Sequence, residues 1–162
     1  VFDHIEKVVY ASKSPRTSES LARMIAKRMD YHLVLLEALD THGKAIYHTN
    51  VVLSIGTYFA IAASSNLSSG SMAELSARMK ASGRMLIEIT DAQMNAFAAN
   101  VLELKNEFGE KLIVISETAF DALSPEQIVG LQQCGLLVPV SVKQIEQVGG
   151  GSVRCMLAEI YS

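Results

Sequence analysis

The sequence lacks any cluster of lysines and arginines. Its 14 basic residues are outnumbered by 17 acidic ones, the signs are mixed along the chain, and the net charge is -3. Proteins that bind nucleic acid neutralise phosphates with grouped cations. We therefore expect no nucleic-acid partner.

A long apolar run is also missing. The longest uncharged stretch, Asn50 to Ser65, is interrupted by Ser54, Gly56 and Thr57. It is too short and too broken to span a bilayer. No charged segment followed by an apolar core opens the sequence, so a signal peptide is not visible. We expect no membrane partner.

Cysteine is scarce, because the chain has only Cys134 and Cys155. Two cysteines form no disulfide framework, and no cysteine or histidine spacing is typical of a metal site. We therefore expect no metal and no cofactor, and a reducing, cytoplasmic location. Cys134, beside Gly135 at a predicted helix end, is most simply structural.

Short apolar segments alternate with helical patterns along the 162 residues, which are 49% hydrophobic. This alternation predicts one α/β or α+β domain with about three related strand–helix–strand modules. Strands are expected at Lys7 to Ser12, Leu33 to Leu36, Ala45 to Leu53, Tyr58 to Ala63, Met85 to Ile89, Asn100 to Leu104, Lys111 to Ile115, Leu136 to Val140 and Val153 to Ile160.

Four helices are expected between these strands. The first starts at Ser14 with Pro15 at its first position and has an apolar stripe of Leu21, Met24, Ile25 and Met29. The others run from about Ser71 to Ala81, from Ser124 to near Gly135, and over Val142 to Val148. A turn at Asn106 to Glu110 connects two strands.

The segment Gly149 to Met156 contains the first candidate for catalysis. Three glycines precede Ser152, and Cys155 follows Arg154, whose positive charge favours the nucleophilic thiolate. Glycines also let a substrate approach backbone N–H groups. The alternative is a tight turn that leads into a last strand with Cys155 as a small buried side chain.

His48 is the candidate partner of Cys155. It stands at the head of the apolar segment Ile46 to Ser54, and histidine moves protons near neutral pH. The other histidines have simpler interpretations: His4 lies in a polar opening, His32 starts a strand, and His42 precedes Gly43 in a turn.

Four segments in order carry a family resemblance: Ser14-Pro15-Arg16-Thr17-Ser18, His48-Thr49-Asn50, Ala98-Ala99-Asn100-Val101-Leu102, and Leu137 to Ser141 leading to Gly149–Cys155. Over essentially its whole length the chain resembles the guanidino-group-modifying (pentein) superfamily. It is most similar to arginine deiminase, dimethylarginine dimethylaminohydrolase and the amidinotransferase-like bacterial citrulline hydrolases.

The resemblance implies a β/α propeller of five ββαβ modules around a central active site, of which about three are present here. It also implies that a cysteine attacks the guanidino or ureido carbon, nitrogen leaves, and water releases a covalent thio-intermediate. Cys155 matches the nucleophile and His48 the general acid and base. Arg16 matches an arginine that binds the substrate α-carboxylate; by itself it reads as a solvated residue near a helix start.

Asn50 departs from arginine deiminase, which has an aspartate at the matching position. An amide both donates and accepts, so it suits a neutral ureido group better than a cation. An unsatisfied buried group costs about 1–3 kcal/mol, which is enough to select between substrates. Asn100 is interpreted as a turn-capping residue.

These observations predict a hydrolase of a free amino acid, with citrulline as the leading substrate and arginine as the second. One alternative is an amidinotransferase that passes the amidino group to an amine, and another is a catalytically silent binding module. We interpret residues 1–162 as the C-terminal portion of a longer enzyme, inactive without its N-terminal part. Open modules expose apolar faces and strand edges, so a homo-oligomer is possible.

Overall fold

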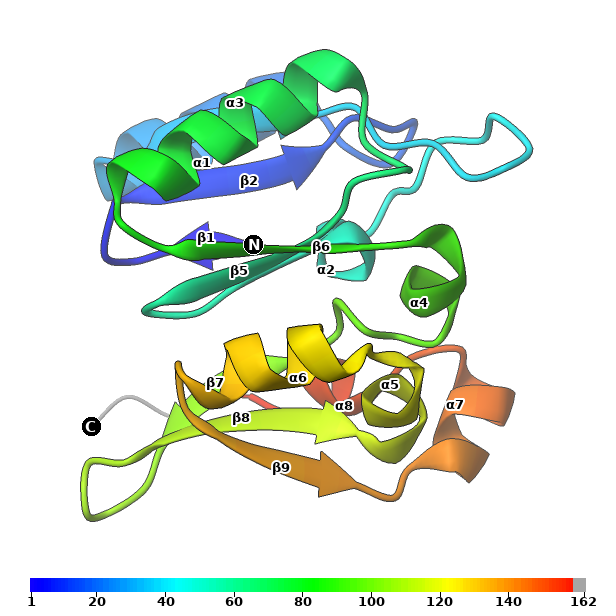
Figure 1. Ribbon diagram of the computed structural model, residues 1–162. Coiled ribbons are helices and arrows are strands. Elements are labelled where there is room, and N and C mark those ends of the chain that lie inside the picture. The colour runs from blue at the N-terminus through cyan, green and yellow to red at the C-terminus, as the bar shows by residue number, and fades with distance from the viewer. Residues whose placement is uncertain (159–162) are drawn as a thin grey trace.

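The protein consists of three similar modules, each with its own sheet. The computed structural model describes residues 1–158. In each three-stranded sheet the first two strands are antiparallel, and the third is parallel to the second. A parallel pair requires a crossover connection, which a helix supplies each time (Figure 1). The predicted three modules are thus confirmed as ββαβ units.

The element bounds follow the module order. The first module contains β1 (Phe2–Asp3), β2 (Val8–Ser12), α1 (Glu19–Met29) and β3 (His32–Leu36). The second contains β4 (Leu53–Ile55), β5 (Phe59–Ala63), α3 (Ser69–Ala81) and β6 (Met85–Ile89). The third contains β7 (Leu102–Lys105), β8 (Lys111–Ser116), α5 (Glu117–Ala122), α6 (Pro125–Gln132) and β9 (Leu136–Val140). The remaining helices are α2 (Thr49–Val52), α4 (Asp91–Asn95), α7 (Lys143–Gly149) and α8 (Val153–Met156).

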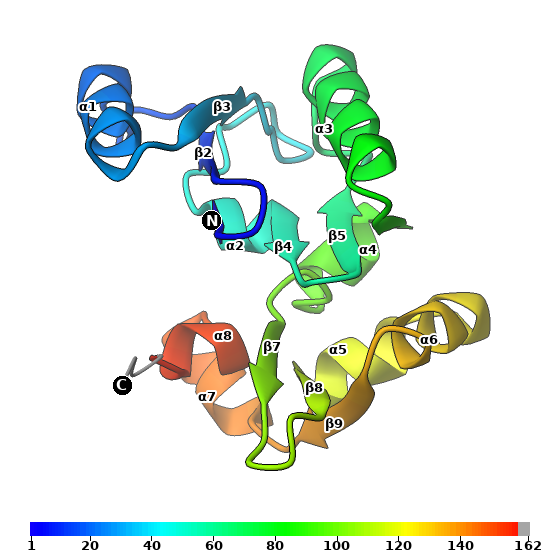
Figure 2. The same cartoon turned by 90° about the vertical axis from the view of Figure 1, so that its left-hand side faces the viewer.

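The modules surround a common centre. Figure 2 shows α1, α3 and α6 on the outside and the strands toward the middle. β5 has no exposed side chain, since each residue of Phe59–Ala63 is 0% exposed. A strand covered on both faces has a continuous apolar sequence, and Phe-Ala-Ile-Ala-Ala is such a run. The second module therefore forms the middle of the core.

The first helix begins later than the sequence predicts. Ser14 and Pro15 lie in a turn, in which the Ser14 carbonyl accepts from Thr17 N at 3.0 Å and the Ser14 hydroxyl accepts from Arg16 N at 3.2 Å. Helix α1 starts at Glu19 with Ser18 as its N-cap. The predicted start at Ser14 is wrong because its side chain closes a local turn, and the next serine caps the helix instead.

The apolar stripe of α1 faces away from the core. Leu21, Met24, Ile25 and Met29 are 54%, 59%, 45% and 40% exposed, whereas Ala26 is 2% exposed. These four side chains share one face by helical spacing. The helix therefore presents an uncovered apolar surface, which we call the α1 apolar face.

Two predicted strands are wrong. Ala45 to Leu53 contains α2 instead, because the Thr49 hydroxyl accepts from Ser12 N at 3.0 Å and draws the segment into a helical turn at the end of β2. Only Leu53 belongs to a strand, β4.

The predicted strand at Val153 to Ile160 contains α8 at Val153–Met156. The Arg154 N–H donates to Asn100 Oδ1 at 3.1 Å and the Cys155 N–H to the Ser152 carbonyl at 2.9 Å, so neither is available to a neighbouring strand. The end of the predicted strand lies outside the described residues.

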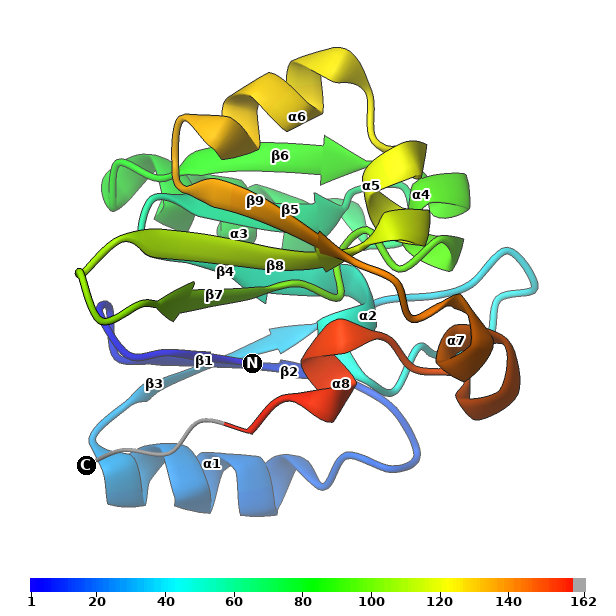
Figure 3. The same cartoon turned by 90° about the horizontal axis from the view of Figure 1, so that it is seen from below.

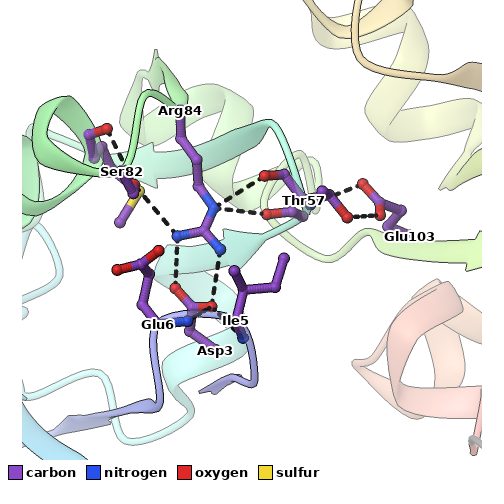
Figure 4. Close-up of polar contacts among 9 residues, drawn as sticks. Asp3, Ile5, Glu6, Thr57, Ser82, Arg84 and Glu103 are labelled. Carbon is purple, nitrogen blue, oxygen red and sulfur yellow. Dashed lines mark hydrogen bonds and ion pairs between the residues drawn. The ribbon is translucent and has the colours of Figure 1, made fainter.

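A buried polar network joins the three modules (Figure 4). Arg84 donates from Nη1 to Asp3 Oδ2 at 2.7 Å and from Nη2 to Oδ1 at 2.8 Å, and both side chains are 2% exposed. Its Nε donates to the Gly56 carbonyl at 3.0 Å. Thr57 then donates from its backbone N to Glu103 Oε2 at 2.9 Å. Each module contributes at least one residue, so the network holds the sheets in their relative positions.

In the part of the chain that the structure describes, no helix is both long and apolar enough to cross a membrane.

Candidate active site

Cys155 lies in α8, directly after the glycine segment, and its side chain is exposed. Gly150 adopts φ +66°, a left-handed conformation that favours glycine. A Cβ on Gly151 would lie 3.3 Å from Cys155 Cβ and 3.4 Å from Sγ. Glycine at position 151 therefore leaves the space beside the thiol open.

Two asparagine amides surround the Cys155 sulfur. Asn100 Nδ2 lies 3.3 Å and Asn50 Nδ2 3.6 Å from Sγ. Asn100 Oδ1 accepts from Arg154 N at 3.1 Å, which turns the amide nitrogen of Asn100 toward the sulfur. The Cys155 sulfur also lies 3.7 Å from Asn100 Oδ1. The two amides therefore hold the Cys155 side chain in one position at the surface.

Asn100 is more central than the sequence indicates. It is 3% exposed within the buried segment Ala98–Val101, and its Nδ2 also lies 3.5 Å from the Asn50 carbonyl. Phe97, at φ 65°, bends the chain just before it, an unusual conformation for a bulky residue. The sequence does contain a signal for this role, since Asn100 is a polar residue inside an apolar run. A buried amide requires hydrogen-bond partners.

Helix α2 brings Asn50 to Cys155, and Figure 3 shows α2 beside α8. The Thr49 hydroxyl binds the end of β2 through Ser12 N, and Val52 is 0% exposed. Helix α2 is therefore held in place by Thr49 and Val52 and carries Asn50 toward the Cys155 sulfur.

His48 is the N-cap residue of α2, two positions before Asn50. Its ring centroid lies 4.2 Å from that of Tyr47, and the Arg16 guanidinium carbon lies 4.2 Å from the Tyr47 centroid. Arg16, Tyr47 and His48 therefore form one exposed cluster, in which Arg16 lies over the Tyr47 ring and the His48 ring is tilted by 47° against it. Among the described residues, no hydrogen bond joins His48 to Cys155 and no salt bridge involves Arg16. Tyr47 was not singled out from the sequence.

Cys134 differs from Cys155 in burial. It is 7% exposed, and its sulfur lies 3.5 Å from the Gly130 carbonyl. Burial raises the pKa of the Cys134 thiol. The thiol is therefore held in its unreactive form, as expected for a structural cysteine.

Within residues 1–158 no group of three or more histidine, cysteine, aspartate or glutamate side chains could hold a metal ion.

Comparison with solved structures finds the same fold in several proteins. The N-terminal domain of ArgZ, a cyanobacterial arginine dihydrolase, is similar with TM-score 0.74 and 18% identity over 96% of this chain and 52% of that one. Unliganded AgrE is similar with TM-score 0.74 and 16% identity, over 96% and 21%. The SxtG amidinotransferase of Microseira wollei gives TM-score 0.62 and 12% identity, over 93% and 43%.

The family is identified by a match over the whole chain. The family described as N,N dimethylarginine dimethylhydrolase, eukaryotic, matches residues 1–162, and the chain belongs to it. No curated protein matches the sequence. The chain spans about half the length of the ArgZ N-terminal domain. The chain thus belongs to a pentein family described as a dimethylarginine hydrolase, and it shares its fold with an arginine dihydrolase and an amidinotransferase.

Proposed function

We propose that this protein contributes the nucleophile of a hydrolase that acts on the ureido or guanidino carbon of a free amino acid, with citrulline favoured over arginine. The observation that carries the proposal is the exposed Cys155 thiol between the amides of Asn50 and Asn100. The ArgZ N-terminal domain, a similar fold, has been obtained with its substrate in a variant that replaces a cysteine by serine.

The reaction begins when Cys155 Sγ attacks the central carbon of the substrate. A C–S bond forms, and the C–N bond to the terminal nitrogen breaks when His48 protonates that nitrogen, so that ammonia leaves. Water, deprotonated by His48, then attacks the same carbon and the C–S bond breaks. Arg16 binds the substrate α-carboxylate, and its stacking on Tyr47 orders the guanidinium.

The first test compares the two thiols. Iodoacetamide at neutral pH should label Cys155 well before Cys134, because Cys155 is exposed between amide donors while burial raises the pKa of Cys134. Peptide mass spectrometry of this chain measures both rates. Equal labelling would contradict the assignment of Cys155 as nucleophile. Ammonia release from citrulline and arginine by a protein with the complete set of modules then tests the reaction.

A second test concerns substrate choice. Asn50→Asp should shift the ratio of kcat/KM from citrulline toward arginine, because a carboxylate pairs with a guanidinium but cannot donate to a ureido oxygen. Asn50 Nδ2 lies 3.6 Å from Cys155 Sγ, so the amide can contact the oxygen or nitrogen atoms of a substrate carbon that is bound to the sulfur. An unchanged ratio would show that Asn50 does not select the substrate. Asn95→Asp, on exposed α4, is the matched control.

Amidino transfer is the second candidate, because SxtG shares the fold. It would use the same Cys155 intermediate with an amine in place of water. Supplying glycine or ornithine separates the two: an amidino-amine product indicates transfer, and ammonia release without such a product indicates hydrolysis.

We further propose that catalysis requires modules beyond these three. The α1 apolar face is uncovered. The corresponding helix of the third module, α6, packs against the sheet of the preceding module, since a Cβ on Gly130 of α6 would lie 3.0 Å from Met85 Sδ of β6.

The isolated 162 residues should therefore release negligible ammonia and associate through the α1 apolar face. Light scattering measures the association, which Met24→Lys with Ile25→Lys should reduce. Robust turnover by a monomer would refute this proposal.

A further inference from the structure

Glu146 in α7 is a buried carboxylate close in sequence to the candidate nucleophile. It is 6% exposed, and the hydroxyl of Ser152, itself 0% exposed, donates to Oε1 at 2.6 Å. Acidic side chains are seldom buried without a specific partner. The reaction proposed for Cys155 uses neither Glu146 nor Ser152, so their contact has another role.

The carboxyl of Glu146 is held in its charged form. Burial acts to raise its pKa, but the Ser152 hydroxyl, together with the nearby hydroxyls of Thr118 and Ser116, outweighs burial and lowers the pKa. Oε2 itself has no partner at hydrogen-bond distance among the described residues, so Ser152 makes the one close contact. Hydrogen bonds to an ionised acceptor are the strong ones.

The same residue contacts the chain on both sides of Gly151. The Glu146 carbonyl accepts from Gly150 N at 3.1 Å, and the Glu146 carboxylate binds Ser152. The Ser152 carbonyl in turn accepts from Cys155 N at 2.9 Å. Consecutive glycines have many backbone conformations to lose. Contacts at Gly150 and Ser152 therefore restrict the conformation of the chain that leads to Cys155.

We propose that Glu146 is a positioning residue, which through Ser152 holds the Cys155 thiol against the amides of Asn50 and Asn100. This rests on the proposed function only in that Cys155 is the nucleophile.

The experiment measures the pH dependence of Cys155 alkylation in this chain, without any turnover. Ser152→Ala and Glu146→Ala should each slow labelling by about tenfold across the pH range, because the Cys155 thiol leaves the exposed position in which Ser152 and the two amides hold it. Glu146→Gln keeps an acceptor for Ser152 and should restore the rate to within about threefold. Gln147→Ala, exposed on the same helix, is the matched control and should label as the parent does.

Protection of Cys134 reports whether each variant remains folded. If Glu146→Ala exposes Cys134, Ser152→Ala decides, because it removes the same hydrogen bond and leaves the carboxylate in place. Parent-like labelling of Ser152→Ala across the pH range, with Cys134 protected, would overturn the inference. If labelling is perturbed in the variants, but the unsubstituted protein with the complete set of modules releases no ammonia, the proposed function is refuted and the positioning role of Glu146 is supported.

Discussion

Replacing His48 by alanine should lower kcat by about 10²–10⁴-fold, which is the usual contribution of a positioned general acid and base. The loss arises because the leaving nitrogen departs unprotonated and water attacks without a base. The measurement is kcat for ammonia release by the protein with the complete set of modules. Substrate binding should change less than kcat, since Arg16 and Asn50 remain.

The structure separates this catalytic loss from a structural one. His48 is the N-cap residue of α2 but makes no side-chain cap hydrogen bond, so alanine removes no helix contact of that kind. His48→Ala should therefore unfold at nearly the parent temperature. His42→Ala, in the exposed turn closed by Asp40, is the matched control and should keep the parent kcat. Parent-like kcat in His48→Ala would remove His48 from the mechanism.

Replacing Arg84 by alanine should lower the free energy of unfolding by about 3–5 kcal/mol, because it leaves the Asp3 carboxylate buried without its partner. Arg84 donates twice to Asp3, and both side chains are 2% exposed. The substitution also removes the donor to the Gly56 carbonyl. Urea unfolding followed by circular dichroism measures the change.

The matched control is the exposed ion pair of Lys7 and Asp30, 3.5 Å apart with side chains 62% and 92% exposed. Lys7→Ala should change the free energy of unfolding by less than about 1 kcal/mol, as is usual for surface pairs. A loss in Arg84→Ala no larger than in Lys7→Ala would show that the network of Figure 4 does not hold the modules together.

Local signals in the sequence predicted much of the secondary structure. Ser124-Pro125-Glu126-Gln127 predicts a helix start, and the structure shows the capping box of α6 there. The predicted turn at Asn106 to Glu110 is confirmed, since Asn106 Oδ1 accepts from the N–H groups of Phe108 and Glu110. These features depend on residues within a few positions of one another, so a single sequence is sufficient to find them.

The two wrong strand predictions share one physical cause. The segment at 45–53 and the one after Val153 are apolar enough for strands, but distant residues bind their polar groups: Thr49 binds Ser12, and Asn100 binds the backbone of Arg154. Such contacts override local preference. Local propensity carries no information about which distant group will occupy a backbone N–H.

The sequence by itself determined the modular α/β architecture, the family resemblance and the choice of Cys155, because strand runs, caps and a glycine-flanked cysteine are local patterns. Only the tertiary structure decided what surrounds the sulfur. Asn50 and Asn100 are 105 and 55 residues from Cys155. Asn50 lies between the first and second modules, and Asn100 lies between the second and third. Side chains so distant meet only when the sheets pack around a common centre. Burial of Asn100 there leaves its amide few partners except the thiol and the backbone beside it.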